Sequence, residues 1–166
     1  MESTFGETQK FNKWWHYLIA GVPCLLIIVL ASLVQFDIVP SKDGSKESEL
    51  FIALIVFTSL IFFWFLVLKL KTFINREGIF ITFAGIPFSK RIIKWEEIQS
   101  IAVVTYSPLT DYGGWGVRYS ASGNGWCYNV SGKNGIKLIR TNGKPFLIGT
   151  QQPGEAEKII NLYFKK

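Results

Sequence analysis

Few side chains in this 166-residue chain have the types and spacing that catalysis requires. The only histidine, His16, lies in a long apolar segment, so the polar part of the chain cannot form a Ser-His-Asp or Cys-His arrangement. Cys24 and Cys127 are far apart in sequence and lack the C-x-x-C spacing of a zinc or redox site. We therefore expect no enzyme, no cofactor and no metal site, with each cysteine acting as a small hydrophobe.

The carboxylates agree with that expectation. From residue 69 onward there are six, and Glu155 and Glu157 suit the positive end of a helix dipole. The spacing of the rest gives no pair that would face one cleft, as a two-carboxylate hydrolase requires. The remaining four are Glu77, Glu96, Glu97 and Asp111.

Two segments without charge, 14–36 and 50–68, dominate the first part of the chain. The first has 23 residues and would extend about 34 Å as a helix, enough to cross a hydrocarbon core of about 30 Å. Buried core helices are the alternative, but two uncharged runs of this length favour two transmembrane helices. Acidic residues outnumber basic ones in the loop 37–49, and lysines flank the two segments. The positive-inside rule then predicts a multi-pass protein of the cell (inner or plasma) membrane with a cytoplasmic tail, 1–13, an external loop and both termini cytoplasmic.

The remainder, 72–166, predicts a cytoplasmic domain of about seven short strands and one final helix. Strand-like runs occur at 79–83, 88–95 and 98–105, with one or two more at 118–130. Asn142-Gly143 between 136–140 and 145–150 is a strong hairpin signal, in which both turn residues would take positive φ. From Pro153 onward the apolar residues adopt the spacing of an amphipathic helix. A bent antiparallel sheet or barrel with a C-terminal helix fits this order.

Two stretches of this domain resemble a known family. Arg91-Ile92-Ile93-Lys94-Trp95-Glu96-Glu97-Ile98 resembles the hydrophobic-x-W-x-x-I step of bacterial pleckstrin-homology-like (PH-like) domains that follow membrane helices. Ile148-Gly149-Thr150-Gln151-Gln152-Pro153 is similar to the end of the same domains. The resemblance implies an α+β membrane protein, in which a two-helix transmembrane hairpin precedes a PH-like seven-stranded bent sheet or barrel capped by a C-terminal helix. Trp95 and Ile98 would be core anchors. Lys69-Leu70-Lys71-Thr72-Phe73 lacks the last Arg of the phosphoinositide motif, so we interpret it as an anchor at the membrane edge.

Charge gives the main indication of a partner. From Lys69 onward, 14 lysines and arginines stand against six acids, a net charge of +8. Such a domain is drawn to an anionic lipid surface. Lys90 and Lys94 share one face of a strand by the two-residue period. Nucleic acid is the rival for a basic surface, but no nucleic-acid motif is present, so we expect no nucleic-acid partner.

The Gly- and aromatic-rich stretch 111–119 leaves two interpretations open. Its Trp, Tyr and Arg residues are hot-spot types for a contact surface, or its aromatics fold back on the barrel or lie at the lipid interface. Tyr106, Trp126 and Tyr128 fit either interpretation. The candidate contacts for lipid or a partner are Lys90, Lys94, Tyr112, Trp115, Arg118 and Tyr119.

We therefore predict a non-enzymatic, membrane-anchored PH-like module that docks on membrane lipids or on a membrane protein partner, with a homo-oligomer as a further candidate. The alternative is a regulatory or assembly subunit of a larger membrane complex that acts through its transmembrane helices.

Overall fold

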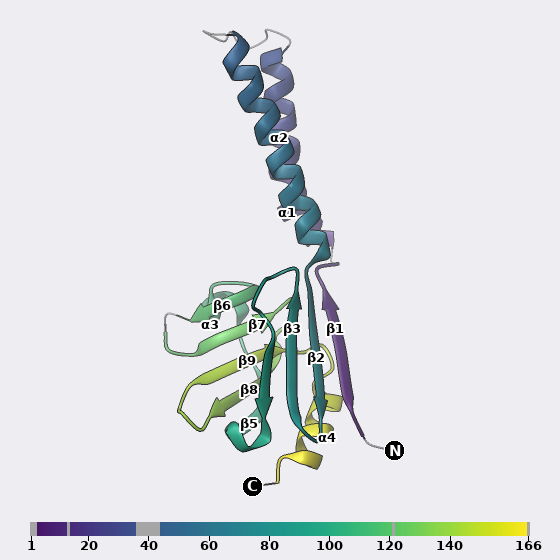
Figure 1. Cartoon of the computed structure of the whole chain (residues 1–166), viewed down its shortest axis with the longest axis vertical. Helices are drawn as coiled ribbons and strands as arrows, with labels where there is room; N and C mark the ends of the chain where they lie inside the picture. The colour runs from purple at the N-terminus through teal and green to yellow at the C-terminus, as the bar shows by residue number, and fades with distance from the viewer. Residues whose placement is uncertain (1–2, 13, 36–43, 121, 166) are drawn as a thin grey trace. The chain divides into compact units, whose positions relative to one another are not determined.

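The computed structural model describes residues 3–12, 14–35, 44–120 and 122–165 (Figure 1). The chain divides into two compact units. Residues up to Lys10 and from Leu68 onward form a β-unit, and Phe11–Val67 forms a helical unit. The sequence had placed the N-terminal residues in a tail of their own.

The helical unit consists of α1 (Trp14–Gln35) and α2 (Gly44–Val67). The thiol of Cys24 on α1 donates to the carbonyl of Thr58 on α2, and the rings of Phe11 and Phe65 lie 4.9 Å apart. Many apolar side chains on both helices are exposed.

No helix in the described part of the chain is long and apolar enough to cross a membrane. A crossing helix needs about 20 consecutive apolar residues for a core of about 30 Å. This finding contradicts the predicted transmembrane hairpin, 14–36 and 50–68, and with it the multi-pass membrane location. Residues 37–43 of the predicted external loop and the side chain of His16 lie outside the described residues.

The first sheet of the β-unit has the strand order β1-β2-β3-β4, all antiparallel. In β1 and β2 buried and exposed residues alternate strictly, which is the pattern of a sheet with one face on the core. The strands are β1 (Phe5–Lys10), β2 (Lys69–Asn75), β3 (Gly78–Ala84) and β4 (Arg91–Lys94). The predicted membrane-edge anchor, Lys69 to Phe73, is therefore part of a strand.

The second sheet has the order β5-β8-β9-β7-β6, in which only β7 and β9 pair in parallel. Its strands are β5 (Ile98–Thr105), β6 (Gly116–Ser120), β7 (Gly125–Asn129), β8 (Asn134–Arg140) and β9 (Pro145–Gly149). The described residues thus form nine strands in two sheets and not the predicted seven-stranded barrel. The two extra strands are β1 and β2, because the region 118–130, predicted as one or two strands, contributes to both β6 and β7.

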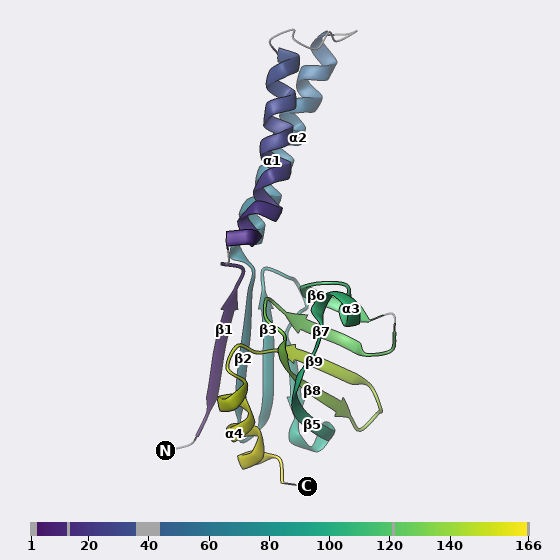
Figure 2. The ribbon, with the colours of Figure 1, turned by 180° about the vertical axis from the view of Figure 1, so that it is seen from behind.

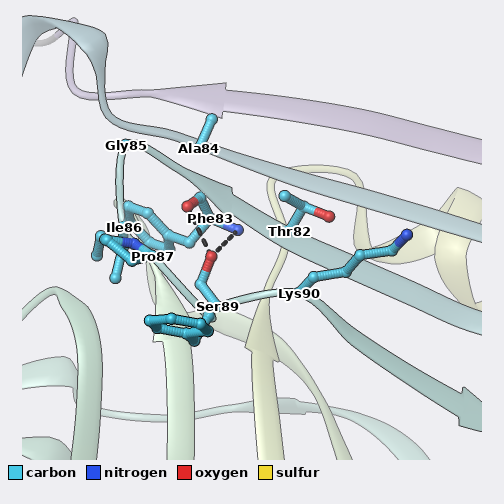
Figure 3. A pocket seen from close by; sticks show the side chains of 9 residues that line it. Thr82, Phe83, Ala84, Gly85, Ile86, Pro87, Ser89 and Lys90 are labelled. Atoms are coloured by element: carbon cyan, nitrogen blue, oxygen red, sulfur yellow. Dashed lines mark hydrogen bonds between the residues drawn. The ribbon is translucent and has the colours of Figure 1, made fainter.

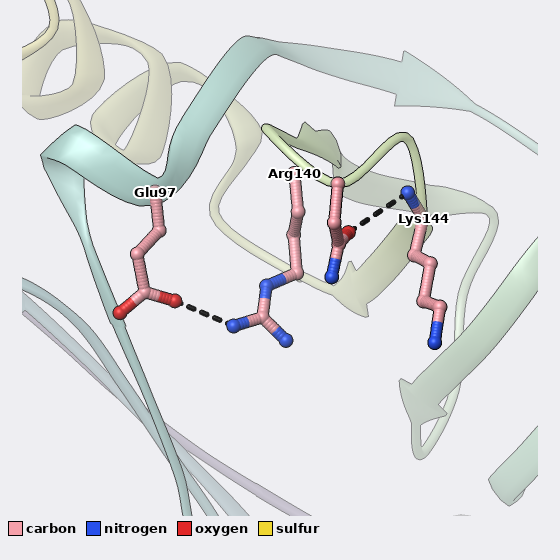
Figure 4. Close-up of polar contacts among 4 residues, drawn as sticks. Glu97, Arg140 and Lys144 are labelled. Atoms are coloured by element: carbon pink, nitrogen blue, oxygen red, sulfur yellow. Dashed lines mark hydrogen bonds and ion pairs between the residues drawn. The ribbon is translucent and has the colours of Figure 1, made fainter.

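The β8–β9 hairpin forms where Asn142-Gly143 predicted it, with a different turn. Gly143 has φ 77°, whereas Asn142 is not among the residues with positive φ. The Asn142 side chain instead accepts a hydrogen bond from the Lys144 amide. Beside the turn of the hairpin, Arg140 forms an ion pair with Glu97 of the 3-10 turn Trp95–Glu97 (Figure 4). This pair ties the start of β5 to the end of β8.

The core lies between the two sheets. Tyr128 of β7 packs between Phe83 of β3 and Phe146 of β9, with ring centroids 6.4 and 5.1 Å away. Ile98 is fully buried, as predicted. Trp95 is half-buried and donates its indole N–H to the Asn75 carbonyl at 2.9 Å.

The expected C-terminal helix is α4 (Pro153–Tyr163), which begins at the predicted proline. It buries Ala156 and Ile160, and contacts β1, β2, β5 and β8 (Figure 2). Its last residue, Tyr163, packs on the ring of Trp95. The mixed α+β class of the prediction therefore agrees with the β-unit.

A buried carboxylate holds β1 in place. The side chain of Glu7 accepts hydrogen bonds from the Thr150 hydroxyl and the Gln151 amide, both at 2.7 Å. Two residues along, the Gln9 side chain donates to the Gly149 carbonyl at 2.6 Å. These bonds join strand β1 to the end of β9 and to the loop before α4, about 140 residues away in sequence.

We expect Glu7→Ala to loosen β1, because the buried Thr150 hydroxyl and the part-buried Gln151 amide would lose their acceptor at a cost of about 2–4 kcal/mol. Deuterium uptake by the peptide that covers β2 should rise, since β1 covers one edge of that strand. Glu7→Gln, which keeps one acceptor oxygen, should have a smaller effect. Thr8→Ala on the exposed face is the matched control, and equal uptake in both alanine variants would contradict the role of the carboxylate.

Candidate functional site

The outer face of the four-stranded sheet carries lysines at one end. Lys69 of β2 lies directly opposite Lys10 of β1, and Lys71 is one step along the same face. Residues directly opposite in such a pair have Cβ atoms about 5 Å apart, and diagonal neighbours are about 7–8 Å apart. We call Lys10, Lys69 and Lys71 the lysine cluster.

No neutralising group is built into this face. The strand residues beside the lysine cluster are Thr8, Thr82 and Ala84, and no residue of the four strands is acidic on the outer face. Like charges directly opposite each other destabilise a sheet. The chain therefore keeps three cations together at a cost to its own stability, and an anion would remove that cost.

Beyond the lysine cluster, an apolar row crosses the same face. Phe73 of β2 lies opposite Phe80 of β3, with ring centroids 6.2 Å apart, and Phe80 lies opposite Ile92 of β4. Phe73 is 43% exposed and Ile92 is 47% exposed. The face therefore offers apolar contact next to positive charge.

The predicted contact residues Lys90 and Lys94 are both exposed, but they lie at opposite ends of this face. Lys94 pairs with Gly78, at the end of the sheet far from the lysine cluster. Lys90 comes just before β4, at the end where the lysine cluster lies. Four residues of extended chain separate them by about 13 Å. Ile92, between them in sequence, is an apolar neighbour of both that the sequence interpretation omitted.

The predicted contact stretch 111–119 does not form one surface. Tyr112 ends the short helix α3 (Pro108–Tyr112) and is buried in a small cluster with Tyr106, Cys127 and Leu147. The rings of Tyr106 and Tyr112 meet edge to face at 5.9 Å. Trp115 is half-buried. For these two aromatics, the fold-back interpretation is the one that the structure supports.

Arg118 and Tyr119 of β6 are both exposed, and the two-residue period of a strand turns them to opposite faces. The Arg118 guanidinium donates to the Trp115 carbonyl at 2.9 Å. Tyr119 is 63% exposed and packs against its cross-strand partner Trp126, with ring centroids 5.3 Å apart. Of the predicted contact residues in this stretch, Arg118 and Tyr119 are therefore the exposed ones, and Tyr119 forms an aromatic pair with Trp126.

A pocket of about 260 Å³ lies beside α3, and its lining includes Tyr106, Asp111 and Tyr112. Its acid, Asp111, already accepts hydrogen bonds from the Ser107 amide and the Thr110 hydroxyl. Burial raises the pKa of Tyr106 and of the Cys127 thiol, and raises the pKa of Tyr112 to about 12. These three side chains therefore stay protonated near neutral pH. The described residues contain no cluster of three or more His, Cys, Asp or Glu that would hold a metal ion.

The chain matches no protein-family model and no curated protein. The resemblance to PH-like domains therefore stays a prediction.

The lysine cluster and its apolar row were missed as a site because Lys10 and Lys69 are 59 residues apart in sequence and were both assigned to the flanks of helices. A local signal was present. In Lys69-Leu70-Lys71-Thr72-Phe73-Ile74, cations and then Phe73 alternate with residues that the structure buries. Strict alternation of this kind is typical of a strand with one exposed face.

We expect Tyr112→Phe to flatten the loss of stability at alkaline pH. The phenol titrates near pH 10 when unfolded but near 12 when folded, so its contribution to stability is complete below pH 10 and is lost as the pH rises from 10 to 12. The melting temperature of the full chain, measured from pH 8 to 12, should therefore fall less in this variant. Tyr119→Phe, on the exposed end of β6, should leave the profile of the wild type unchanged. A profile for Tyr112→Phe that follows the wild type would contradict the burial argument.

Proposed function

We propose that this chain is a non-enzymatic docking module that binds anionic lipid headgroups through the lysine cluster. The observation that carries the proposal is the direct cross-strand pairing of Lys10 with Lys69, with Lys71 alongside. Three ammonium groups on one exposed face suit phosphate groups presented side by side. Docking of this kind needs no helix that crosses a membrane.

The expected electrostatic free energy of binding is sufficient for reversible attachment to lipid. Each lysine close to an anionic surface contributes about 1 kcal/mol, so the cluster would contribute about 3 kcal/mol, a factor of about 100 in affinity. The exposed side chains of Phe73 and Ile92 would add apolar contact. The electrostatic part weakens with salt, because charges are screened over about 8 Å at physiological ionic strength.

The exposed Tyr119–Trp126 pair supports a second candidate, a protein partner. Tyr and Trp are enriched at the energetic centres of protein interfaces. This surface lies on the β6–β7 hairpin of the other sheet, so substitutions can separate the two candidates. The other predicted role, an assembly subunit that acts through its transmembrane helices, requires spans that no described helix provides.

To test the lipid proposal, the full chain is mixed with vesicles that contain either neutral lipid alone or neutral lipid with acidic lipid. The triple variant Lys10→Gln, Lys69→Gln and Lys71→Gln should bind the acidic vesicles about 100-fold more weakly. Its binding to neutral vesicles should match that of the wild type, and its melting temperature should not fall, since charge repulsion is removed.

The matched control is Lys133→Gln, Lys144→Gln and Lys158→Gln, which removes the same charge from exposed positions away from this face. It should keep most of the binding. If the wild type binds neutral and acidic vesicles equally, or if both triple variants lose the same affinity, the lysine cluster is not a lipid site.

A further inference from the structure

Phe88, in the loop between β3 and β4, is the most unusual residue of the β-unit. Its side chain is 94% exposed, and it is the only residue other than glycine with positive φ, 55°, in the described part of the chain. A bulky residue in this backbone region is strained, and an exposed Phe gains nothing from the core. Neither feature is explained by the packing of the fold.

The loop around Phe88 is held firmly (Figure 3). The Ser89 hydroxyl donates to the Phe83 carbonyl at 2.7 Å and accepts from the Phe83 amide at 3.1 Å. The Arg91 guanidinium donates to the carbonyl of Phe88 itself at 2.8 Å. The Phe88 ring is therefore presented by an ordered loop, so little conformational entropy is lost when it binds.

This loop lies at the same end of the sheet as the lysine cluster. It begins after Ala84, the cross-strand partner of Lys69, and Lys69 is the partner of Lys10. It ends at the exposed Lys90. An exposed aromatic ring and four cations therefore gather at one end of the four-stranded sheet.

We propose that Phe88 is a wedge that enters the boundary between headgroups and acyl chains of an anionic bilayer. The inference rests on the proposed function and extends it from headgroup contact to insertion. Aromatic rings favour this boundary, and cations beside them hold the anionic headgroups. A protein interface fits less well, because lysine is depleted from such interfaces.

The wedge also accounts for the strain. A residue held in a rare backbone region persists when function requires it, and its cost falls on stability. Glycine adopts positive φ without penalty. Phe88→Gly should therefore raise the melting temperature while it removes the ring that inserts.

The first test compares Phe88→Ala with Leu109→Ala in the full chain. Leu109 of α3 is also well exposed, at 62%, so both variants lose an exposed apolar side chain. Phe88→Ala should bind acidic vesicles about tenfold more weakly, and Leu109→Ala should bind them as the wild type does. Phe88→Gly should lose as much binding as Phe88→Ala with no loss of melting temperature.

The second test places an environment-sensitive fluorophore on Phe88→Cys or on Leu109→Cys, with Cys24 and Cys127 replaced by Ala. The probe at position 88 should shift to the blue with acidic vesicles and be quenched by a quencher attached to the acyl chains. The probe at position 109 should do neither.

The outcomes separate the two proposals. If the probe at 88 stays in water and Phe88→Ala binds normally while the lysine cluster is still required, the wedge is wrong and headgroup docking stands. If neither Phe88→Ala nor the lysine triple variant weakens binding to acidic vesicles, both proposals fail.

Discussion

The arrangement of the β-unit depends on the pairing of β1 with β2, and the buried carboxylate of Glu7 fixes that pairing. The two hydrogen bonds that it accepts from Thr150 and Gln151 join the first strand to the loop before the last helix. A buried carboxylate without such partners would be costly, so this register is strongly preferred over its neighbours. A shift by one residue would turn Glu7 outward and Lys10 inward.

The proposed site follows from the same register. Lys10 lies opposite Lys69 because Glu7 lies opposite Thr72. The hydrogen bonds of Glu7 on the inner face thus determine which lysines lie opposite each other on the outer face. A change in the register of β1 would therefore alter the proposed site without any change in β2. Because successive side chains of β1 point to opposite faces of the sheet, the buried contacts of this strand also fix the positions of its exposed charges.

Elements with strong local patterns could be predicted from the sequence. Strand β5 has the predicted bounds, α4 begins at Pro153, and Ile98 is in the core. The features that failed depend on information far away in the chain. Nothing near Phe5–Lys10 reveals that its partner is β2. The predicted spans 14–36 and 50–68 were drawn from the length, the lack of charge and the flanking residues of two segments. Tyr112 was predicted as a contact because composition cannot tell an exposed loop aromatic from one that α3 turns onto Tyr106.

Charge and apolar insertion would act at different ranges on the proposed lipid surface. In the proposed docking, the lysines would act over a distance of about a Debye length, so they would orient the sheet before contact and respond to salt. A ring such as that of Phe88 gains nothing until it leaves water, and its contribution is almost independent of salt. Because the loop that carries the ring is already ordered by Ser89 and Arg91, the second step follows the first without rearrangement. The lysines would therefore speed association with the lipid surface, and the inserted Phe88 ring would slow dissociation. Neither the cations nor the ring would produce both effects alone.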